Sequence, residues 1–393
     1  MRRRFLCLSI CVALFVSLSC GDRDRSEEEA AVSSDRVPEF RVGHVGHDHH
    51  LALYVAALEG EALDSHCGAF LKEIKETEVY DLIVSGEHLA RLRFVKVGGG
   101  SRMPAAMERG EIDMGLGGVA PVIFFIDKGN PFKIIFPLQT DGDMLVMRPD
   151  FPATDWSSFV SYIHDTETVL KIGYKAPVAV AKLIFERALQ AESIPIAHQS
   201  EGVSGKVELV NLQDEANMVP SLLSGAVDGF VVNQPHASVA VHKGAGKIIC
   251  DLSALPPDGK WKQHPCCCVA SSESMIASHR EVLKGFLKVL CGATDLIHSD
   301  QSLAVRDAAT WTKFPEDVEA DSVPSVNYIN APSPEWLAGM RTWAEMMGEI
   351  GKFSGSLKGK SPQDVLELVA ICQLSRRSFQ RIRCRWGTDI STR

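Results

Sequence analysis

Short apolar runs of strand length alternate with longer segments of helical periodicity over most of this chain. Residues 40–46 form the first apolar run, and residues 49–63 carry large apolar side chains at the three- and four-residue spacing of a helix face. Further apolar runs at residues 91–100, 112–118 and 132–139 are again separated by helical segments. This alternation predicts an α/β domain in which helices cover both faces of a parallel sheet.

Two stretches, residues 103–135 and 219–249, repeat one order of helix, glycine, strand, loop, helix, Lys-Gly and strand. The matching pairs are Gly110 with Gly225, Asp113 with Asp228, and Lys128-Gly129 with Lys243-Gly244. Solenoids need at least about three short repeats to bury a continuous core. A long unit that occurs only twice therefore predicts two similar α/β lobes with a cleft between them. The paired aspartates are expected to satisfy turn or cap hydrogen bonds, not to act as a catalytic pair.

The second lobe is predicted from a further set of apolar runs separated by helical segments. The runs are residues 169–175, 207–212, 227–233 and 247–253, and the helices are near residues 178–192, 215–224 and 236–243. The chain is expected to enter this lobe along residues 143–149 and to return along residues 262–272, so that two crossings form a hinge. From residue 273 onward the pattern is mainly helical and is expected to pack on the first lobe.

The amino-terminal residues follow the pattern of an export signal. Three arginines at positions 2–4 precede an apolar run over residues 5–18, too short to span about 30 Å of hydrocarbon as a helix. Ser19 before Cys20 is typical of a bacterial lipoprotein signal. We therefore expect a signal peptide over residues 1–20 and lipidation of Cys20, with simple secretion as the alternative. Residues 21–38, charged and poor in large apolar side chains, are expected to form a flexible tether.

The rest of the chain is too long for one hydrophobic core, since roughly 330 residues remain without signal, tether and tail. The expected boundaries are 39–146 for the first part of lobe I, 147–264 for lobe II, 265–372 for the return to lobe I, and 373–393 for a disordered basic tail. A net charge of −9 argues against nucleic acid as a partner. The 11 cysteines show no compact disulfide framework.

The order of several segments between residues 51 and 300 resembles that of a family of transport proteins. These segments are LALYVAALEGEAL, GGGS, MERGEIDMGLGGVAPVI, KIGY, LLSGAVDGFVVNQP and HREVLKGFLKVLCGATDLIHSD. They resemble the substrate-binding proteins of ABC importers for nitrate, sulfonates and taurine, and more closely their relatives that handle the pyrimidine half of thiamine. The resemblance covers roughly residues 40–370. It implies an α/β type II periplasmic-binding-protein fold, with two doubly wound lobes joined by a two-strand hinge.

The resemblance implies solute binding without catalysis. A small polar or heteroaromatic solute, such as nitrate, a sulfonate, taurine or a thiamine-pyrimidine-like compound, would be held between the lobes, and the closed form would be presented to an ABC permease in the cytoplasmic membrane. Together with the signal, this predicts a monomeric lipoprotein in the periplasm or on the outer face of that membrane. No enzyme activity, cofactor or metal is predicted.

A cysteine run keeps other functions open. Yeast-type thiamine-pyrimidine synthases share the fold and carry a cysteine-rich run, linked to iron, before the equivalent long helix. Cys266–Cys268 stand at that place here, and Asp48, His49 and His50 precede the first helix. The chain has Ala270 where those enzymes have a further cysteine, and its export signal is foreign to a cytosolic synthase. An iron-dependent synthase-like enzyme and a metal-binding lipoprotein are the alternatives.

Ligands of open α/β sheets bind beyond the carboxyl ends of the strands, where loops and helix N-termini meet. Glycines in these loops let the backbone approach a ligand, Tyr174 can stack on a ring, and a helix is expected to begin near Ser101 as its N-cap. The predicted ligand-binding residues are His47, Asp48, His49, His50, Gly99, Gly100, Ser101, Gly118, Val119, Tyr174, Lys175, Asn233, Gln234, His236 and Cys266.

The histidines and cysteines of this set admit several interpretations. His47 and His49 lie in a loop, where an imidazole can contact a solute, serve the structure or bind a metal. On a regular strand Cys266 and Cys268 point to one face and Cys267 to the other. This geometry favours packing, with at most one cysteine touching the ligand, over a metal or redox site.

Overall fold

Two β-sheets organise the part of the chain that the computed structural model describes, residues 37–197 and 204–371. The predicted signal peptide, Cys20, nearly all of the tether and the basic tail lie outside these residues. Both sheets belong to one compact unit that begins at Pro38. In these two described ranges, no helix combines the length and the apolar character needed to cross a membrane.

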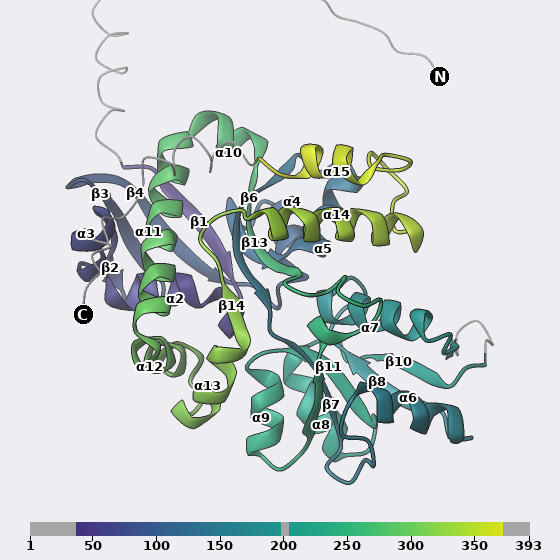
Figure 1. Ribbon diagram of the computed structural model, residues 1–393. Coiled ribbons are helices and arrows are strands. Elements are labelled where there is room, and N and C mark those ends of the chain that lie inside the picture. The colour runs from purple at the N-terminus through teal and green to yellow at the C-terminus, as the bar shows by residue number, and fades with distance from the viewer. Residues whose placement is uncertain (1–36, 198–203, 372–393) are drawn as a thin grey trace, which may run out of the picture. The chain divides into compact units, whose positions relative to one another are not determined.

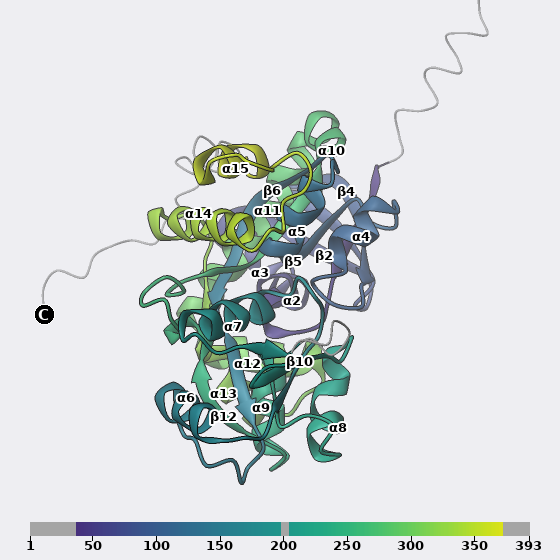
Figure 2. The same ribbon diagram turned by 90° about the vertical axis from the view of Figure 1, so that its right-hand side faces the viewer.

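The first sheet is covered by helices on both faces, as the alternating pattern predicts (Figures 1 and 2). Across the sheet its strands are β14 (Val326–Tyr328), β6 (Phe132–Asp141), β13 (Pro265–Ser272), β5 (Met114–Gly118), β1 (Glu39–His44), β4 (Glu87–Lys96), β3 (Val79–Val84) and β2 (Ala69–Lys75). One face carries α2 (Leu51–Glu59), α3 (Ala62–Cys67) and α11 (Arg280–Ser299), and the other carries α4 (Met103–Glu108), α5 (Val119–Asp127), α14 (Pro334–Glu349) and α15 (Pro362–Val369). With α10 (Glu273–Ser278), α12 (Gln301–Thr312) and α13 (Glu316–Ser322), these elements make up lobe I.

The hairpin of β2 and β3 is not evident from the sequence pattern. β2 buries Ala69 and Leu71, but its last four residues are exposed and mostly charged. The alternation of apolar and polar residues that marks a half-buried strand is therefore lost over most of its length. The hairpin lies at the sheet edge, where β3 pairs antiparallel with β4.

The second sheet shows why its apolar runs are continuous. Its strands are β12 (Lys247–Asp251), β7 (Asp143–Met147), β11 (Gly229–Asn233), β8 (Leu170–Tyr174), β10 (Val207–Asn211) and β9 (Ile196–Ala197), and with α6 (Trp156–Asp165), α7 (Val180–Ala191), α8 (Met218–Leu223) and α9 (His236–His242) they form lobe II. Phe230 and Val232 of β11 pack in one core with α8 and α9, whereas Val231 packs in the core that contains α6 and α7. Successive side chains of a strand point to opposite faces, so a sheet covered on both faces needs apolar residues at every position.

The chain passes between the sheets at Gly142, which separates β6 from β7, and returns between β12 and β13. The second sheet thus begins at Asp143, ahead of the boundary expected at residue 147. β7 and β13 enter from the opposite lobe and run antiparallel to their neighbours, while β1, β4 and β5 are mutually parallel. The prediction of purely parallel sheets is therefore wrong, and both sheets are mixed. A strand that enters a lobe from the cleft runs away from the cleft, opposite in direction to the neighbouring strands that end there.

The aspartates of the two repeats have the same structural role. Asp113 accepts a hydrogen bond from the backbone N–H of Arg41 in β1 at 2.7 Å, and Asp228 accepts one from the backbone N–H of Lys171 in β8 at 2.9 Å. Each also pairs with an arginine side chain, of Arg41 and of Arg148 respectively. Each carboxylate therefore ties its strand to the parallel neighbour, which confirms the structural interpretation of the pair.

Candidate functional site

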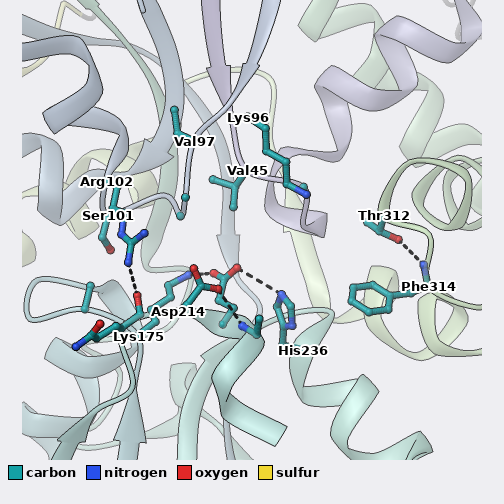
Figure 3. A pocket seen from close by; sticks show the side chains of 17 residues that line it. Val45, Lys96, Val97, Ser101, Arg102, Lys175, Asp214, His236, Thr312 and Phe314 are labelled. Atoms are coloured by element: carbon teal, nitrogen blue, oxygen red, sulfur yellow. Dashed lines mark hydrogen bonds and ion pairs between the residues drawn. The ribbon is translucent and has the colours of Figure 1, made fainter. Parts of the chain in front are cut away.

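A cavity of about 230 Å³ lies where the loops at the carboxyl ends of strands from both lobes meet (Figure 3). Lobe I lines it with the loop after β1, with Lys96 at the end of β4 and with the loop that follows β4, and lobe II lines it with the loops after β8, β10 and β11. Thr312 and Phe314, at the end of α12, complete the wall. The cavity thus lies at the strand ends at which the sequence predicts a ligand site.

Two cationic side chains enter this cavity from lobe I. Figure 3 shows Lys96 and Arg102 extending from one side and Lys175, Asp214 and His236 from the other. The Arg102 guanidinium donates across the cleft to the backbone oxygen of Gln213 at 2.7 Å. Within residues 37–197 and 204–371, neither Lys96 nor Arg102 forms an ion pair with a carboxylate. Their charges are therefore available to an anionic group.

The lobe II side of the cavity contains a mostly buried charge cluster. The Lys175 ammonium donates to Glu215 and to Asn233, and His236 lies 3.4 Å from the other Glu215 oxygen. Burial would raise the pKa of Glu215, but Lys175 and the hydrogen bond from His236 outweigh it, so the pKa lies well below its ordinary value. Burial likewise opposes the Lys175 charge, yet Glu215 keeps the pKa of Lys175 raised. Lys175 and Glu215 are therefore both charged.

A second cavity of about 20 Å³ adjoins the first and shares Ser101 and Lys175 with it. Its volume accommodates about one water-sized group. The other lining residues are His47, His49, Gly100, Gly118, Asp143, Val180, Ala181, Asn233, Cys266 and Cys267. Ser101 caps no helix, contrary to expectation, because α4 begins at Met103 and Arg102 occupies the N-cap position.

His49 links this small cavity to the cysteine run and to the crossing at Gly142. Its Nε2 lies 3.1 Å from the Gly142 oxygen, and its Nδ1 lies 3.3 Å from Cys266 Sγ and 4.0 Å from Cys267 Sγ. The prediction that Cys266 and Cys267 point to opposite faces of the strand is wrong. The pairing of β13 with β6 shifts register on both sides of Cys267, so the strand is not regular there. A hydrogen bond from Cys266 lowers the pKa of Cys267 well below its ordinary value, whereas burial raises the pKa of Cys266.

Ten of the fifteen predicted ligand-binding residues line one of the two cavities. They are His47, His49, Gly99, Gly100, Ser101, Gly118, Lys175, Asn233, His236 and Cys266. The structure brings these residues together from both lobes, as the convergence of loops at strand ends predicts.

The other five predicted residues, Asp48, His50, Val119, Tyr174 and Gln234, line neither cavity. Asp48 is buried and bonds Ser322, and burial together with the nearby Glu319 raises its pKa well above the usual range. The other four serve the fold: His50 Nδ1 accepts from Val45 N–H, Gln234 accepts from Ser238 N–H, Tyr174 packs against the core under Lys182, and Val119 is buried at the start of α5.

Several residues that line the cavities are not in the predicted set, among them Lys96, Arg102, Gln213 to Ala216 and Phe314. Lys96 lies two residues before the glycine run at residues 98–100, and a cation so close to a predicted ligand loop is a signal in the sequence. Gln213 to Ala216 and Phe314 belong to a turn after β10 and a turn after α12. No local pattern marks those turns, because only tertiary packing brings them to the cleft.

A sequence model described as the NMT1-like family matches residues 39–312. This chain belongs to the NMT1-like family. An uncharacterised protein of Methanocaldococcus jannaschii is 34% identical over 119 residues, which are 30% of this chain and 82% of that protein.

Solved structures similar to this NMT1-like protein include components of importers. The nitrate-binding protein NrtA from Synechocystis PCC 6803 has a TM-score of 0.68 at 13% identity, over 88% of this chain and 90% of its own. A ligand-binding component of an ABC-type import system from Staphylococcus aureus, with zinc bound, has a TM-score of 0.65 at 14% identity, over 87% and 99%. The alkanesulfonate-binding protein SsuA from Xanthomonas axonopodis pv. citri, bound to MOPS, has 0.61 at 14%, over 86% and 100%. The NMT1-like chain therefore has the periplasmic-binding-protein fold that the sequence predicts.

Both crossings of the NMT1-like protein are tied together by a buried histidine. His264, before β13, lies with Nε2 3.2 Å from an Asp143 oxygen and Nδ1 3.3 Å from an Asp141 oxygen, on either side of Gly142. Burial would lower the pKa of His264, but the neighbouring Asp141 and Asp143 carboxylates raise it to about 10, while Nδ1 lies 2.8 Å from the Trp261 backbone oxygen. An imidazolium between two carboxylates therefore joins the two segments of the hinge.

Gly142 is required where the first crossing turns. Its φ is +81°, and a Cβ would lie 2.7 Å from His49 Nε2 and 2.8 Å from Val326 Cγ2. We expect Gly142→Ala to lower the free energy of unfolding by about 2–4 kcal/mol, since a left-handed backbone and two close contacts are combined. Gly110→Ala is the control, because Gly110 has φ +68° but no atom within 4 Å of a new Cβ. Equal losses in urea unfolding would show that the contacts with His49 and Val326 cost nothing.

Proposed function

We propose that this protein is the extracytoplasmic solute-binding lipoprotein of an ABC importer. The observation that carries the proposal is the cavity of about 230 Å³ lined by both lobes, which Arg102 bridges by its bond to Gln213. A solute there can contact lobe I and lobe II together only when the lobes are closed, so binding shifts the population toward the closed form. A monomer with a lipid anchor at Cys20 would present that form to a permease in the cytoplasmic membrane. Nucleic acid is not a partner in this proposal.

The lining of the cavity supports a small solute with an anionic or acceptor-rich group. Lys96 and Arg102 offer cationic donors without carboxylate partners, while Val45, Val97 and Phe314 offer apolar surface for a short carbon skeleton or a ring. Ligand pockets for drug-sized molecules are usually about 300–1,000 Å³, so this cavity suits a smaller compound. The nitrate- and alkanesulfonate-binding proteins named above take compounds of this class, which adds support for sulfonate, taurine or nitrate. Phe314 could equally stack on a thiamine-pyrimidine-like ring.

A thermal-shift panel of MOPS, taurine, nitrate, bicarbonate and an aminopyrimidine tests this function, because a ligand of the native state raises the melting temperature. For an anionic compound that binds, we expect Arg102→Ala to weaken affinity roughly 10- to 100-fold, since a hydrogen bond between charged groups contributes about 1.5–3 kcal/mol. Calorimetry measures the change.

The matched control is Arg109→Ala in the same lobe. Arg109 is exposed and pairs with Glu111 outside the cavity, so its removal should leave affinity unchanged. Equal effects of the two substitutions, or a panel in which no compound raises the melting temperature, would contradict the proposal.

The alternative of an iron-dependent synthase-like enzyme draws on one observation, the grouping of His49 with Cys266 and Cys267 beside the cleft. Chemical conversion of a bound pyrimidine in the presence of Fe²⁺ would favour the enzyme. Release of the same compound unchanged would favour transport.

A further inference from the structure

We propose that His49, Cys266 and Cys267 form a mononuclear site for a thiophilic divalent ion, Zn²⁺, with one coordination position open to the small cavity. The three side chains are buried, and one ligand atom of each lies within 4.8 Å of the others. All three come from lobe I, so the ion would bind without closure of the cleft. The proposal is therefore independent of the solute-binding role.

The separations of the ligand atoms match a tetrahedral zinc centre. Zn–N bonds of about 2.0 Å and Zn–S bonds of about 2.3 Å at tetrahedral angles place the nitrogen about 3.5 Å from each sulfur. The observed distances from His49 Nδ1 are 3.3 Å to Cys266 Sγ and 4.0 Å to Cys267 Sγ. Shifts of these atoms by about half an ångström would therefore place three of the four ligands of a tetrahedral zinc ion.

The tautomer of His49 leaves the required atom free. The Gly142 carbonyl oxygen, 3.1 Å from Nε2, can only accept a hydrogen bond, so Nε2 carries the proton. When Nδ1 carries no proton, its lone pair points at the two sulfurs. A histidine that binds a metal through one ring nitrogen usually donates the N–H of the other to an acceptor such as a backbone carbonyl, which fixes the orientation of the ring.

The irregular pairing of β13 explains how adjacent cysteines converge. On a regular strand Cys266 and Cys267 would face opposite sides, but register shifts flank Cys267. Cys268, beyond the second shift, does not belong to the group of ligand atoms around His49 and packs in the hydrophobic core. The strand thus turns two thiols toward one imidazole and leaves the third outside this group of ligand atoms.

The donor set fits zinc better than the iron linked to the related synthases. Two thiolates balance the charge of Zn²⁺ once both thiols have released their protons, and a neutral imidazole completes a Cys₂His set with one open position. Single non-haem iron usually takes two histidines and a carboxylate, and the carboxylate at this cavity, Asp143, is paired with His264. His47 lines the same cavity, and its Nδ1 has no partner among the described residues, so it can accept a hydrogen bond from water on the ion.

The test uses the full chain without an affinity tag, reduced, stripped with a chelator and supplied with Zn²⁺ alone. We expect one zinc per chain by plasma mass spectrometry. We also expect at least a tenfold loss of affinity, by chelator competition, in each of Cys266→Ala, Cys267→Ala and His49→Ala. Co²⁺ should give a thiolate charge-transfer band that falls by about half in either cysteine variant, because two thiolates bind the ion.

Cys268→Ala is the matched control, since it removes a buried thiol from the same strand outside the ligand group. It should retain the zinc and the cobalt band. Circular dichroism of each metal-free variant separates loss of a ligand from loss of the fold. Less than one-tenth of a zinc per chain in the wild type, retention of zinc in the three ligand variants, or stoichiometric binding of Fe²⁺ in preference to Zn²⁺ would overturn the proposal.

Discussion

Replacing His264 by leucine is expected to lower the free energy of unfolding by about 3–5 kcal/mol near neutral pH, because it leaves the buried Asp143 carboxylate without its cationic partner. Asp143 is only 2% exposed and His264 only 1%. Burial alone would raise the pKa of Asp143, and the hydrogen bond from His264 is the main reason that the pKa is instead lowered. Urea unfolding of wild type and variant measures the difference.

The pH dependence of stability distinguishes this charge effect from a packing effect. A histidine whose pKa rises from 6.5 to about 10 on folding stabilises fully below pH 6.5, and this contribution is lost as pH rises through 10. The stability of the wild type should therefore fall between pH 6.5 and 10, and that of His264→Leu should not. His242→Leu removes an exposed histidine whose pKa is raised by its hydrogen bond to Asp321, so it should reduce this slope much less than His264→Leu does. A flat wild-type profile over this range would contradict the proposed charge state.

The two-lobed fold could be predicted because its signals are local and repeated. Gly110 and Gly225 adopt φ values of +68° and +72° after equivalent helices, and Asp113 and Asp228 bond equivalent neighbouring strands. Each of these requirements restricts the residue type at its position, so the repeat can be recognised in the sequence. The cleft follows, because parallel strands end where two such lobes face each other.

The rest could not be predicted because it depends on contacts between distant segments. Asp143 and His264 are 121 positions apart, and neither lies in a motif that marks the other as its partner. The convergence of Cys266 and Cys267 depends on a register shift that no residue pattern announces. Asp48 follows two loop residues that line the cleft, yet its partner Ser322 lies in α13 and draws it away.

The last prediction concerns Lys175, the residue of lobe II that lines both cavities. Lys175→Met is expected to weaken binding of an anionic member of the solute panel roughly 30- to 1,000-fold, because the loss of a desolvated charge contact costs about 2–4 kcal/mol. It should also destabilise the protein, because Glu215, only 9% exposed, would lose the ammonium that most lowers its pKa. Calorimetry and urea unfolding measure the two effects.

A second substitution separates the two roles of Lys175. In Lys175→Met/Glu215→Gln no carboxylate is left without a partner, so stability should recover in part while affinity for the anion should not. A carboxyl whose pKa is lowered on folding stabilises the protein above its unfolded pKa, and this contribution is lost as pH falls through the folded value. The deficit of the single variant should therefore shrink below about pH 4.5, where Glu215 accepts a proton in the variant and in the unfolded chain alike. Recovery of affinity together with stability would mean that Lys175 acts by holding Glu215 and the loop after β10 in place, and that the ammonium itself does not contact the solute.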